Sequence, residues 1–191
     1  MEAKVDIEGT YKIGLAREQV WDALQNADIL QQCIPGCEEL ELLSDNRYLA
    51  KVVAAIGPVK ATFKTNIEMQ NLTPPESYTL IGEAKSGAAG FGKGSADISL
   101  IESGDFTTLY YKAQFKVGGK LAQVGSRLVA GVTRKMADEF FGKFSLALDH
   151  SAERVVSVDD EKSVTQRARR HRFLYIAVSA TFILFVWWLL S

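Results

Sequence analysis

The stretch Val59-Lys-Ala-Thr-Phe-Lys-Thr-Asn-Ile-Glu-Met-Gln70 alternates side chains of two kinds along its whole length. Val59, Phe63 and Met69 belong to one set, which is mostly apolar, whereas the other set contains lysine, asparagine, glutamate and glutamine. Successive side chains of a β-strand point to opposite faces of the sheet, so this alternation indicates a strand with one buried face and one face in water. The stretch therefore predicts a strand of a sheet whose inner face is apolar.

The same period of two extends in both directions along the chain. Residues 5–13 alternate in the same way, and the segment from Glu38 to Val117 predicts five or six strands separated by short runs rich in Gly, Pro, Asn, Asp and Ser. Between them, Arg17–Asn26 and Ala27–Gln32 are typical of two short helices. Strands joined by short turns form an antiparallel meander, so the sheet is predicted to be antiparallel.

A long amphipathic helix is predicted after the last strand, over Lys120–Leu148. Its apolar residues recur at steps of three and four, at Leu121, Val124, Leu128, Val132, Met136, Phe140 and Phe144. The order of elements favours an α+β fold in which a curved antiparallel sheet wraps around one long C-terminal helix.

Small residues occupy the predicted inner face in adjacent strands, at Gly82, Ala84, Gly92, Gly94 and Ala96. Protein interiors are normally close-packed, so small side chains beneath an apolar helix predict a cavity. The alternative is that these glycines relieve curvature of the sheet. The two interpretations are compatible, because a strongly curved sheet is also one that can wrap a ligand.

We expect a ligand to lie against inward side chains of the sheet and of the long helix. Tyrosine is the only ionisable residue type on the predicted inner face, so an uncharged, apolar ligand is favoured. The predicted ligand-binding residues are Tyr48, Phe63, Met69, Tyr78, Gly94, Ala96, Tyr111, Phe115, Leu121, Val124 and Leu128.

Catalysis and metal binding are not predicted. His150 and His171 lie outside the predicted sheet and helix, and Cys33 and Cys37 are too few for a zinc site and too far apart for a thioredoxin-type pair. The glycines of residues 90–94 lack the following helix of a phosphate-binding loop. The net charge of −1 argues against a nucleic-acid partner. We therefore expect no catalytic residue, no metal and no tightly bound cofactor.

The C-terminal segment predicts a membrane anchor. Residues 173–190 contain no charged side chain, and as a helix these 18 residues would span about 27 Å, close to the hydrocarbon thickness of a bilayer. Residues 167–172 include four arginines, which favours a single-pass protein whose body faces the cytosol at the cytoplasmic membrane. The polar residues 149–172 predict a linker that ends in this basic cluster. The alternative is that residues 173–190 form a buried core helix.

Four segments resemble the CoxG family of carbon-monoxide-dehydrogenase subunits. They are CIPGCEEL at 33–40, IGPVKA at 56–61, GFGKGSAD at 90–97 and VGGKLAQVGSRL at 117–128. The resemblance covers residues 1–148 and implies a START-like helix-grip domain, in agreement with the topology predicted from periodicity. It also implies an accessory, non-catalytic role beside a molybdenum hydroxylase of the CO-dehydrogenase type. Members with a C-terminal membrane segment are implied to recruit that enzyme to the membrane and to pass its electrons to quinone.

The sequence therefore leads to one hypothesis and two alternatives. The hypothesis is a tail-anchored protein that binds an isoprenoid quinone or a similar lipid and docks a molybdenum hydroxylase at the membrane. A START-like enzyme, such as a cyclase or hydrolase, would need polar catalytic groups on the inner face, where the pattern offers only tyrosines. A pure membrane-docking scaffold would instead have a filled core.

Overall fold

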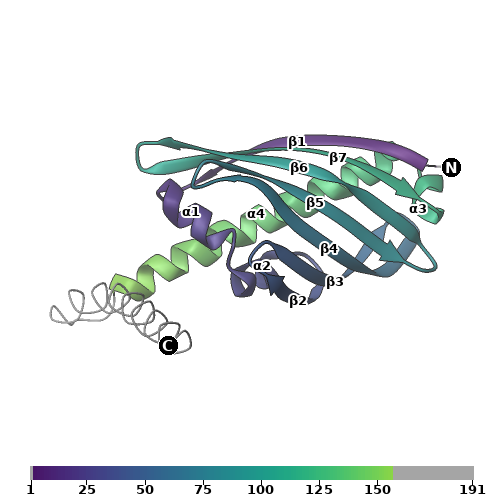
Figure 1. Cartoon of the computed structure of the whole chain (residues 1–191), viewed down its shortest axis with the longest axis horizontal. Coiled ribbons are helices and arrows are strands. Elements are labelled where there is room, and N and C mark those ends of the chain that lie inside the picture. Colours follow the sequence, from purple (N-terminus) through teal and green to yellow (C-terminus); the bar gives the residue numbers. More distant parts are fainter. Residues whose placement is uncertain (1, 157–191) are drawn as a thin grey trace, which may run out of the picture. The chain divides into compact units, whose positions relative to one another are not determined.

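The computed structural model describes residues 2–156, which form seven strands and four helices (Figure 1). The elements follow in the order β1 (Glu2–Ile13), α1 (Arg17–Ala23), α2 (Ala27–Cys33), β2 (Cys37–Ser44), β3 (Arg47–Ile56), β4 (Val59–Thr73), β5 (Ser77–Ser86), β6 (Gly90–Ser103), β7 (Phe106–Gly118), α3 (Lys120–Gln123) and α4 (Ser126–Val156). The predicted order of strands and helices is confirmed, except that the predicted last helix is divided into α3 and α4.

The seven strands form one antiparallel sheet in the order β1-β7-β6-β5-β4-β3-β2. Strands β2 to β7 follow one another as a meander, and β1 completes the sheet by pairing with β7, from Glu2 opposite Gly118 to Ile13 opposite Thr107. The sheet curves, and α4 runs along its inner face (Figure 1). The structure is therefore an α+β fold with a curved antiparallel sheet and a C-terminal helix, as the alternation of residues 59–70 predicts.

The two short helices are separated by a side-chain cap. Asn26 accepts hydrogen bonds through Oδ1 from the backbone N–H groups of Asp28 and Ile29, at 3.0 and 3.2 Å. Asparagine is a favoured N-cap residue, so the chain begins α2 here, and α1 ends at Ala23 instead of extending to Asn26. Helix α2 ends at Cys33 because the residue before Pro35 disfavours helical geometry.

The C-terminal helix differs from the prediction at both ends. The periodicity predicts one helix over Lys120–Leu148, but the structure breaks it into α3 and α4. Gly125 lies between them with a φ of +91°, a conformation that glycine adopts readily and that no α-helix contains. At the other end α4 continues to Val156 and so includes the first residues of the predicted linker 149–172. The alanine, glutamate and arginine of residues 152–154 are good helix formers.

The chain divides into two compact units, residues 1–151 and residues 152–191, and the sheet lies in the first of them. The remaining linker residues 157–172 and the predicted membrane segment 173–190 lie outside the described residues. Within residues 2–156, no helix combines the length and the apolar character that crossing a bilayer requires.

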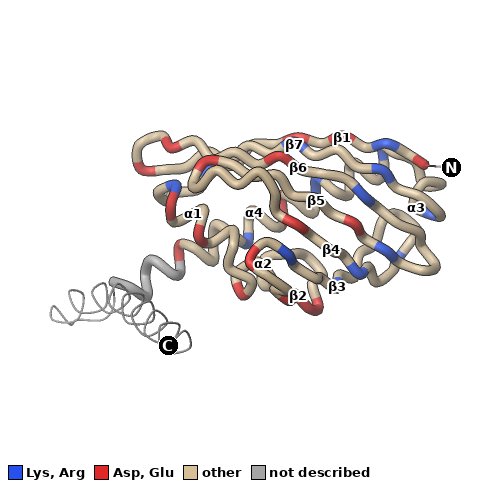
Figure 2. Tube along the Cα trace, viewed as in Figure 1, with Lys and Arg blue, Asp and Glu red and all other residues tan. Residues whose placement is uncertain are grey.

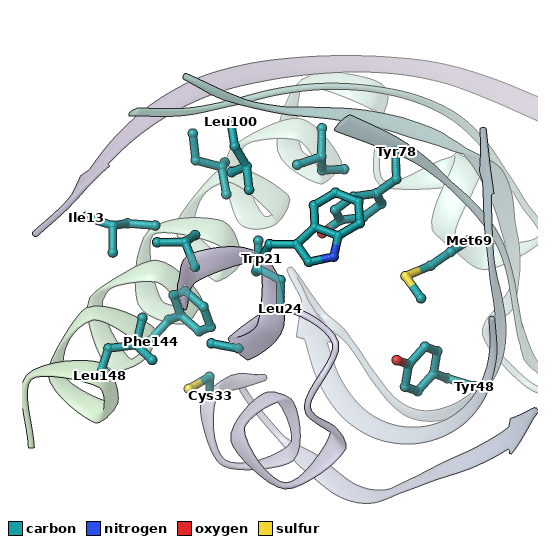
Figure 3. Packing of buried hydrophobic residues seen from close by; sticks show 14 residues of the cluster. Ile13, Trp21, Leu24, Cys33, Tyr48, Met69, Tyr78, Leu100, Phe144 and Leu148 are labelled. Carbon is teal, nitrogen blue, oxygen red and sulfur yellow. The ribbon is translucent and has the colours of Figure 1, made fainter. Parts of the chain in front are cut away.

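The buried side chains of the first unit form two separate clusters. The first gathers where α1, α2 and the later turns of α4 meet the sheet, and Figure 3 shows Trp21 and Phe144 within it. Trp21 meets Tyr78 edge to face, with ring centroids 5.5 Å apart. The second cluster lies around α3 and the first turns of α4, and includes Phe63, Leu121 and Val129. The inner face of the sheet is thus closed at two places by buried side chains.

Candidate functional site between the sheet and helix α4

A half-buried region separates the two clusters on the inner face. One row of residues in register crosses the sheet from β3 to β1 through this region: Tyr48, Ile67, Gly82, Gly94, Phe115 and Val5. Tyr48 and Val5 at the two ends are buried, whereas the four residues between them are only partly buried. Thr133, Met136 and Ala137 of α4 are also partly buried. The middle of the inner face is therefore less tightly covered than its two ends.

Two glycines of this row have different surroundings. A Cβ atom built on Gly82 would have no heavy atom within 4 Å, so this position opens onto empty space. A Cβ atom on Gly94 would clash with the carbonyl oxygen of Gln114 and would lie 2.5 Å from the Cα of Phe115. Gly94 thus allows β6 to approach β7 closely, while Gly82 leaves room. The two glycines therefore differ in whether an added side chain would find room.

The predicted ligand-binding residues are distributed over both clusters and the region between them. Tyr48, Met69 and Tyr78 belong to the first cluster, and Ala96 packs against it. Phe63 and Leu121 belong to the second, against which Phe115 and Val124 pack.

Three predicted ligand-binding residues have other surroundings. Tyr111 packs against both clusters, so it lies at the centre of the half-buried region. Gly94 is half-buried. Leu128 lies outside both clusters: it is 42 % exposed, and its Cδ2 is 2.6 Å from the position that a Cβ on Gly57 would take. Val129, the next residue along α4, is buried instead.

A polar pair that the sequence analysis missed joins the sheet edge to α4. The hydroxyl of Tyr11 on β1 donates a hydrogen bond of 2.6 Å to Oδ1 of Asp138 on α4. The ring of Tyr11 stacks on Phe141, with centroids 4.1 Å apart, and lies nearly parallel to the ring of Tyr111 at 6.1 Å. Asp138 and Phe141 are three residues apart on α4, a spacing that places two side chains on one helix face and is the signal available in the sequence.

Burial keeps the tyrosine hydroxyls of the inner face protonated. Burial raises the pKa of Tyr11 above its usual value, and the hydrogen bond to Asp138 raises it further. Burial also raises the pKa values of Tyr111, Tyr48 and Tyr78. Tyr48 already donates to the carbonyl oxygen of Gln25 at 3.1 Å, so its hydroxyl has a structural partner. At neutral pH these groups are neutral hydrogen-bond donors.

The cysteines show no arrangement for redox or metal chemistry. Cys33 is buried and Cys37 is half-buried, both thiols are free, and burial raises the pKa of each. A raised pKa lowers the thiolate fraction and with it the reactivity. Among residues 2–149, no group of three or more His, Cys, Asp or Glu side chains is arranged to hold a metal ion.

A hollow of about 920 Å³ lies against the strands of the sheet, and its lining includes Ile67, Gly82, Gly94 and Phe115 of the half-buried row. Charged side chains also line it, among them Lys4, Lys93, Lys116 and Arg47. Lys4 lies opposite Lys116 in the register of β1 and β7, and Lys116 lies opposite Lys93 in that of β7 and β6. Figure 2 shows basic and acidic residues interleaved along the strands. The hollow is thus lined both by charged side chains of the strands and by residues of the half-buried row.

The family model for CoxG, a subunit family of carbon monoxide dehydrogenase, matches residues 9–149, which include nearly all of the sheet and the part of α4 that packs on it. The chain belongs to the CoxG family. The membership confirms the resemblance carried by residues 33–40, 56–61, 90–97 and 117–128. No curated protein matches the chain.

Solved structures place this CoxG-family chain among START-like folds. It is similar to a conserved protein from Geobacillus kaustophilus, with 31% identity and a TM-score of 0.73 over 77% of this chain and 97% of that one. A START superfamily protein from Mycobacterium smegmatis has 15% identity and a TM-score of 0.54, over 78% of this chain and 98% of that one. The Zhui aromatase/cyclase from Streptomyces sp. R1128 has 15% identity and a TM-score of 0.56, over 81% and 97% of the two chains. The last two likenesses establish the fold alone.

Proposed function

We propose that this CoxG-family protein is a non-catalytic, membrane-anchored accessory protein that binds an isoprenoid quinone between its sheet and α4. In this role it recruits a molybdenum hydroxylase of the CO-dehydrogenase type to the cytoplasmic membrane and aids electron transfer to quinone. The proposal is supported above all by the half-buried region of the inner face. That region is bordered by two apolar clusters and opens onto empty space at Gly82.

The chemistry of the inner face favours an uncharged ligand. Ile67, Phe115 and Met136 are apolar, and the tyrosine hydroxyls nearby are uncharged at neutral pH. A charged ligand would lose its hydration here without gaining a counter-charge from the strands, and that loss is costly. A quinone with an isoprenoid tail carries no charge, and relative to water each CH₂ group that it buries is stabilised by about 0.8 kcal/mol, which offsets its removal from the bilayer.

Family membership and the sequence of the tail support the remainder of the proposal. The CoxG family takes its name from carbon monoxide dehydrogenase, so a partner of that type is the natural hypothesis. The apolar segment 173–190, with arginines before it, would hold the body at the cytosolic surface of the membrane. A protein held at this surface and able to shield a quinone would bring the lipid substrate and the soluble enzyme together.

Ligand binding is tested by extracting the full chain from its native membranes and identifying bound lipids by mass spectrometry. The wild-type chain is expected to carry a quinone, and Gly82→Phe is expected to lose it because the new ring fills the empty space. Ile81→Phe is the matched control, since Ile81 is the adjacent residue, is 39 % exposed and lies on the outer face. A quinone retained by a folded Gly82→Phe variant, or absent from the wild type, would overturn this part of the proposal.

Recruitment is tested by separating membranes from cytosol in cells that produce the molybdenum hydroxylase. With the full chain present, we expect the hydroxylase activity to sediment with the membranes. A chain that ends at residue 172 is expected to leave the activity in the cytosol. Activity that remains soluble in the presence of the full chain would contradict the proposed partner.

A further inference from the structure

The side chain of Tyr111 is held in one position on the inner face by the strand beside it. Tyr111 lies opposite Gly9 in the register of β7 and β1. A Cβ atom on Gly9 would lie 2.5 Å from Cε1 of the Tyr111 ring and 2.9 Å from its hydroxyl oxygen. The ring therefore lies across the strand at Gly9, and any side chain larger than hydrogen at that position would displace it.

The neighbouring hydroxyl of Tyr11 already donates its hydrogen bond to Asp138. It has one proton, which it gives to Asp138 at 2.6 Å. The ring of Tyr111 lies beside the ring of Tyr11, with centroids 6.1 Å apart. A hydroxyl has one donor and two acceptor positions, so with its proton on Asp138 the oxygen of Tyr11 can only accept. Of the two tyrosine hydroxyls, that of Tyr111 is therefore the one that can donate a hydrogen bond to a ligand.

Apolar surface surrounds this polar group on the side of the interior. Tyr111 packs against both buried clusters, and Phe141 stacks with both tyrosine rings, with centroids 4.1 and 6.3 Å away. Such a combination of aromatic faces and a single redirectable hydroxyl fits a flat ring that bears an oxygen substituent.

We propose that the Tyr111 hydroxyl binds the oxygen substituent of the ligand ring. This hydroxyl lies over Gly9 and beside the hydrogen-bonded pair of Tyr11 and Asp138. It donates to the carbonyl of an oxidised ring. It accepts from the hydroxyl of a reduced ring through a lone pair of its oxygen. This inference rests on the proposed function, because it assigns the polar end of the same ligand site. It places the head of the ligand beside β1 and α4, and it lets one hydroxyl bind either oxidation state of the ring.

The test compares two probes of the same shape. These are 2,3-dimethyl-1,4-naphthoquinone, which has two carbonyls, and 2,3-dimethylnaphthalene, which has none. Binding of each to the full chain in quinone-free nanodiscs is measured by equilibrium dialysis, with empty nanodiscs as the reference for partitioning. The wild type is expected to bind the quinone about tenfold more tightly than the hydrocarbon, the effect of one buried neutral hydrogen bond.

Tyr111→Phe keeps the ring and removes the hydroxyl, so it is expected to bring both probes to the same affinity and to leave binding of the hydrocarbon unchanged. Tyr110→Phe is the matched control, because Tyr110 is the adjacent residue, is 43 % exposed and lies on the outer face. It is expected to keep the tenfold preference. Gly9→Ala retains every hydroxyl but displaces the Tyr111 ring, and is expected to reduce the preference as well.

The outcomes separate this inference from the function on which it rests. Equal binding of both probes by the wild type, or an unchanged preference in folded Tyr111→Phe, would overturn the assignment to Tyr111 and leave the apolar site intact. Failure of the wild type to bind either probe would instead overturn the apolar site itself, and this inference with it.

Discussion

The two ends of the sheet's inner face and its middle carry the same alternation of residues but differ in packing. At the ends, side chains such as Phe144 and Leu109 are completely shielded from solvent. In the middle, Ile67 and Phe115 occupy equivalent inward positions and remain partly accessible. The comparison teaches that hydrophobic alternation determines which face is inward, whereas the size of the facing residues determines whether that face is filled.

Truncation of a phenylalanine at each place should give the largest effect. Phe144→Ala removes a fully buried ring and is expected to lower the free energy of unfolding by about 3–5 kcal/mol. Phe115→Ala is expected to cost about 1–2 kcal/mol, because part of that ring is already in contact with solvent. Urea denaturation followed by circular dichroism measures both changes. Equal losses would show that the middle is packed as tightly as the ends.

Alanine at the two glycines sharpens the comparison within the middle itself. Gly94→Ala forces the backbone of β6 away from Gln114 and is expected to cost about 1–3 kcal/mol. Gly82→Ala meets no atom within 4 Å and is expected to be neutral or to stabilise by up to about 1 kcal/mol, because alanine reduces the entropy of the unfolded chain. The same denaturation assay applies. A large loss at position 82 would mean that no open space exists there.

The stability of the protein at alkaline pH reports on the burial of Tyr78, which belongs to the cluster at one end of the inner face. Burial raises the pKa of Tyr78, so above pH 10 the unfolded chain loses this proton while the folded chain retains it. The free energy of unfolding therefore falls as the pH rises above 10, with a slope of up to about 1.4 kcal/mol per pH unit for one such group. Tyr78→Phe removes this contribution and is expected to flatten the curve measured between pH 9 and 11. Parallel curves for the variant and the wild type would show that Tyr78 does not cause this fall in stability.

A substitution on the outer face, next to the same row, should give the smallest change in the free energy of unfolding. Lys116 faces Lys4 and Lys93 in register, and like charges directly opposite one another are unfavourable. Lys116→Glu creates two opposite-charge pairs but loses the ion pair of Lys116 with Glu2 at 3.7 Å. We expect a gain of a few tenths of a kcal/mol at low ionic strength that disappears in 1 M salt, where charges are screened. A gain that persists in salt would point to a cause other than charge.

The sequence predicted the strands and the inner face because both depend on local periodicity. Lysine at positions 60, 64, 93, 112 and 116 assigns the outward set without ambiguity, since a lysine side chain is rarely buried without a partner. The turns at Gly57-Pro58 and Ser103-Gly104-Asp105 coincide with runs rich in Gly, Pro, Asp and Ser, because Gly and Asp favour the backbone angles that hairpin turns require.

The phase of the long helix was not predictable in the same way. The expected apolar stripe runs from Leu121 through Leu128 as one continuous helix, but Gly125 interrupts it and α4 starts afresh at Ser126. After this break Val129 is buried and Leu128 is exposed. A glycine inside a helical pattern usually costs only about 1 kcal/mol. Whether it interrupts the helix depends on tertiary packing, which periodicity does not reveal.

The polar part of the site was missed for a related reason. Tyr11 and Asp138 are separated by 127 residues, and their hydrogen bond depends on how α4 is rotated about its axis relative to β1. Periodicity identifies the apolar stripe of a helix but not which polar residue at its border meets the sheet edge. The sequence could therefore predict the apolar lining of the site. The position of the Asp138 carboxylate beside it follows only from the three-dimensional structure.

The unoccupied volume at Gly82 offers a position for a reporter group. The chain contains two native cysteines, and burial raises the pKa of both, which slows their alkylation at neutral pH. A thiol introduced as Gly82→Cys would have no heavy atom within 4 Å of its Cβ, so this position has room for a spin label or an environment-sensitive dye. The spectrum of that label would follow the filling and emptying of the protein in real time.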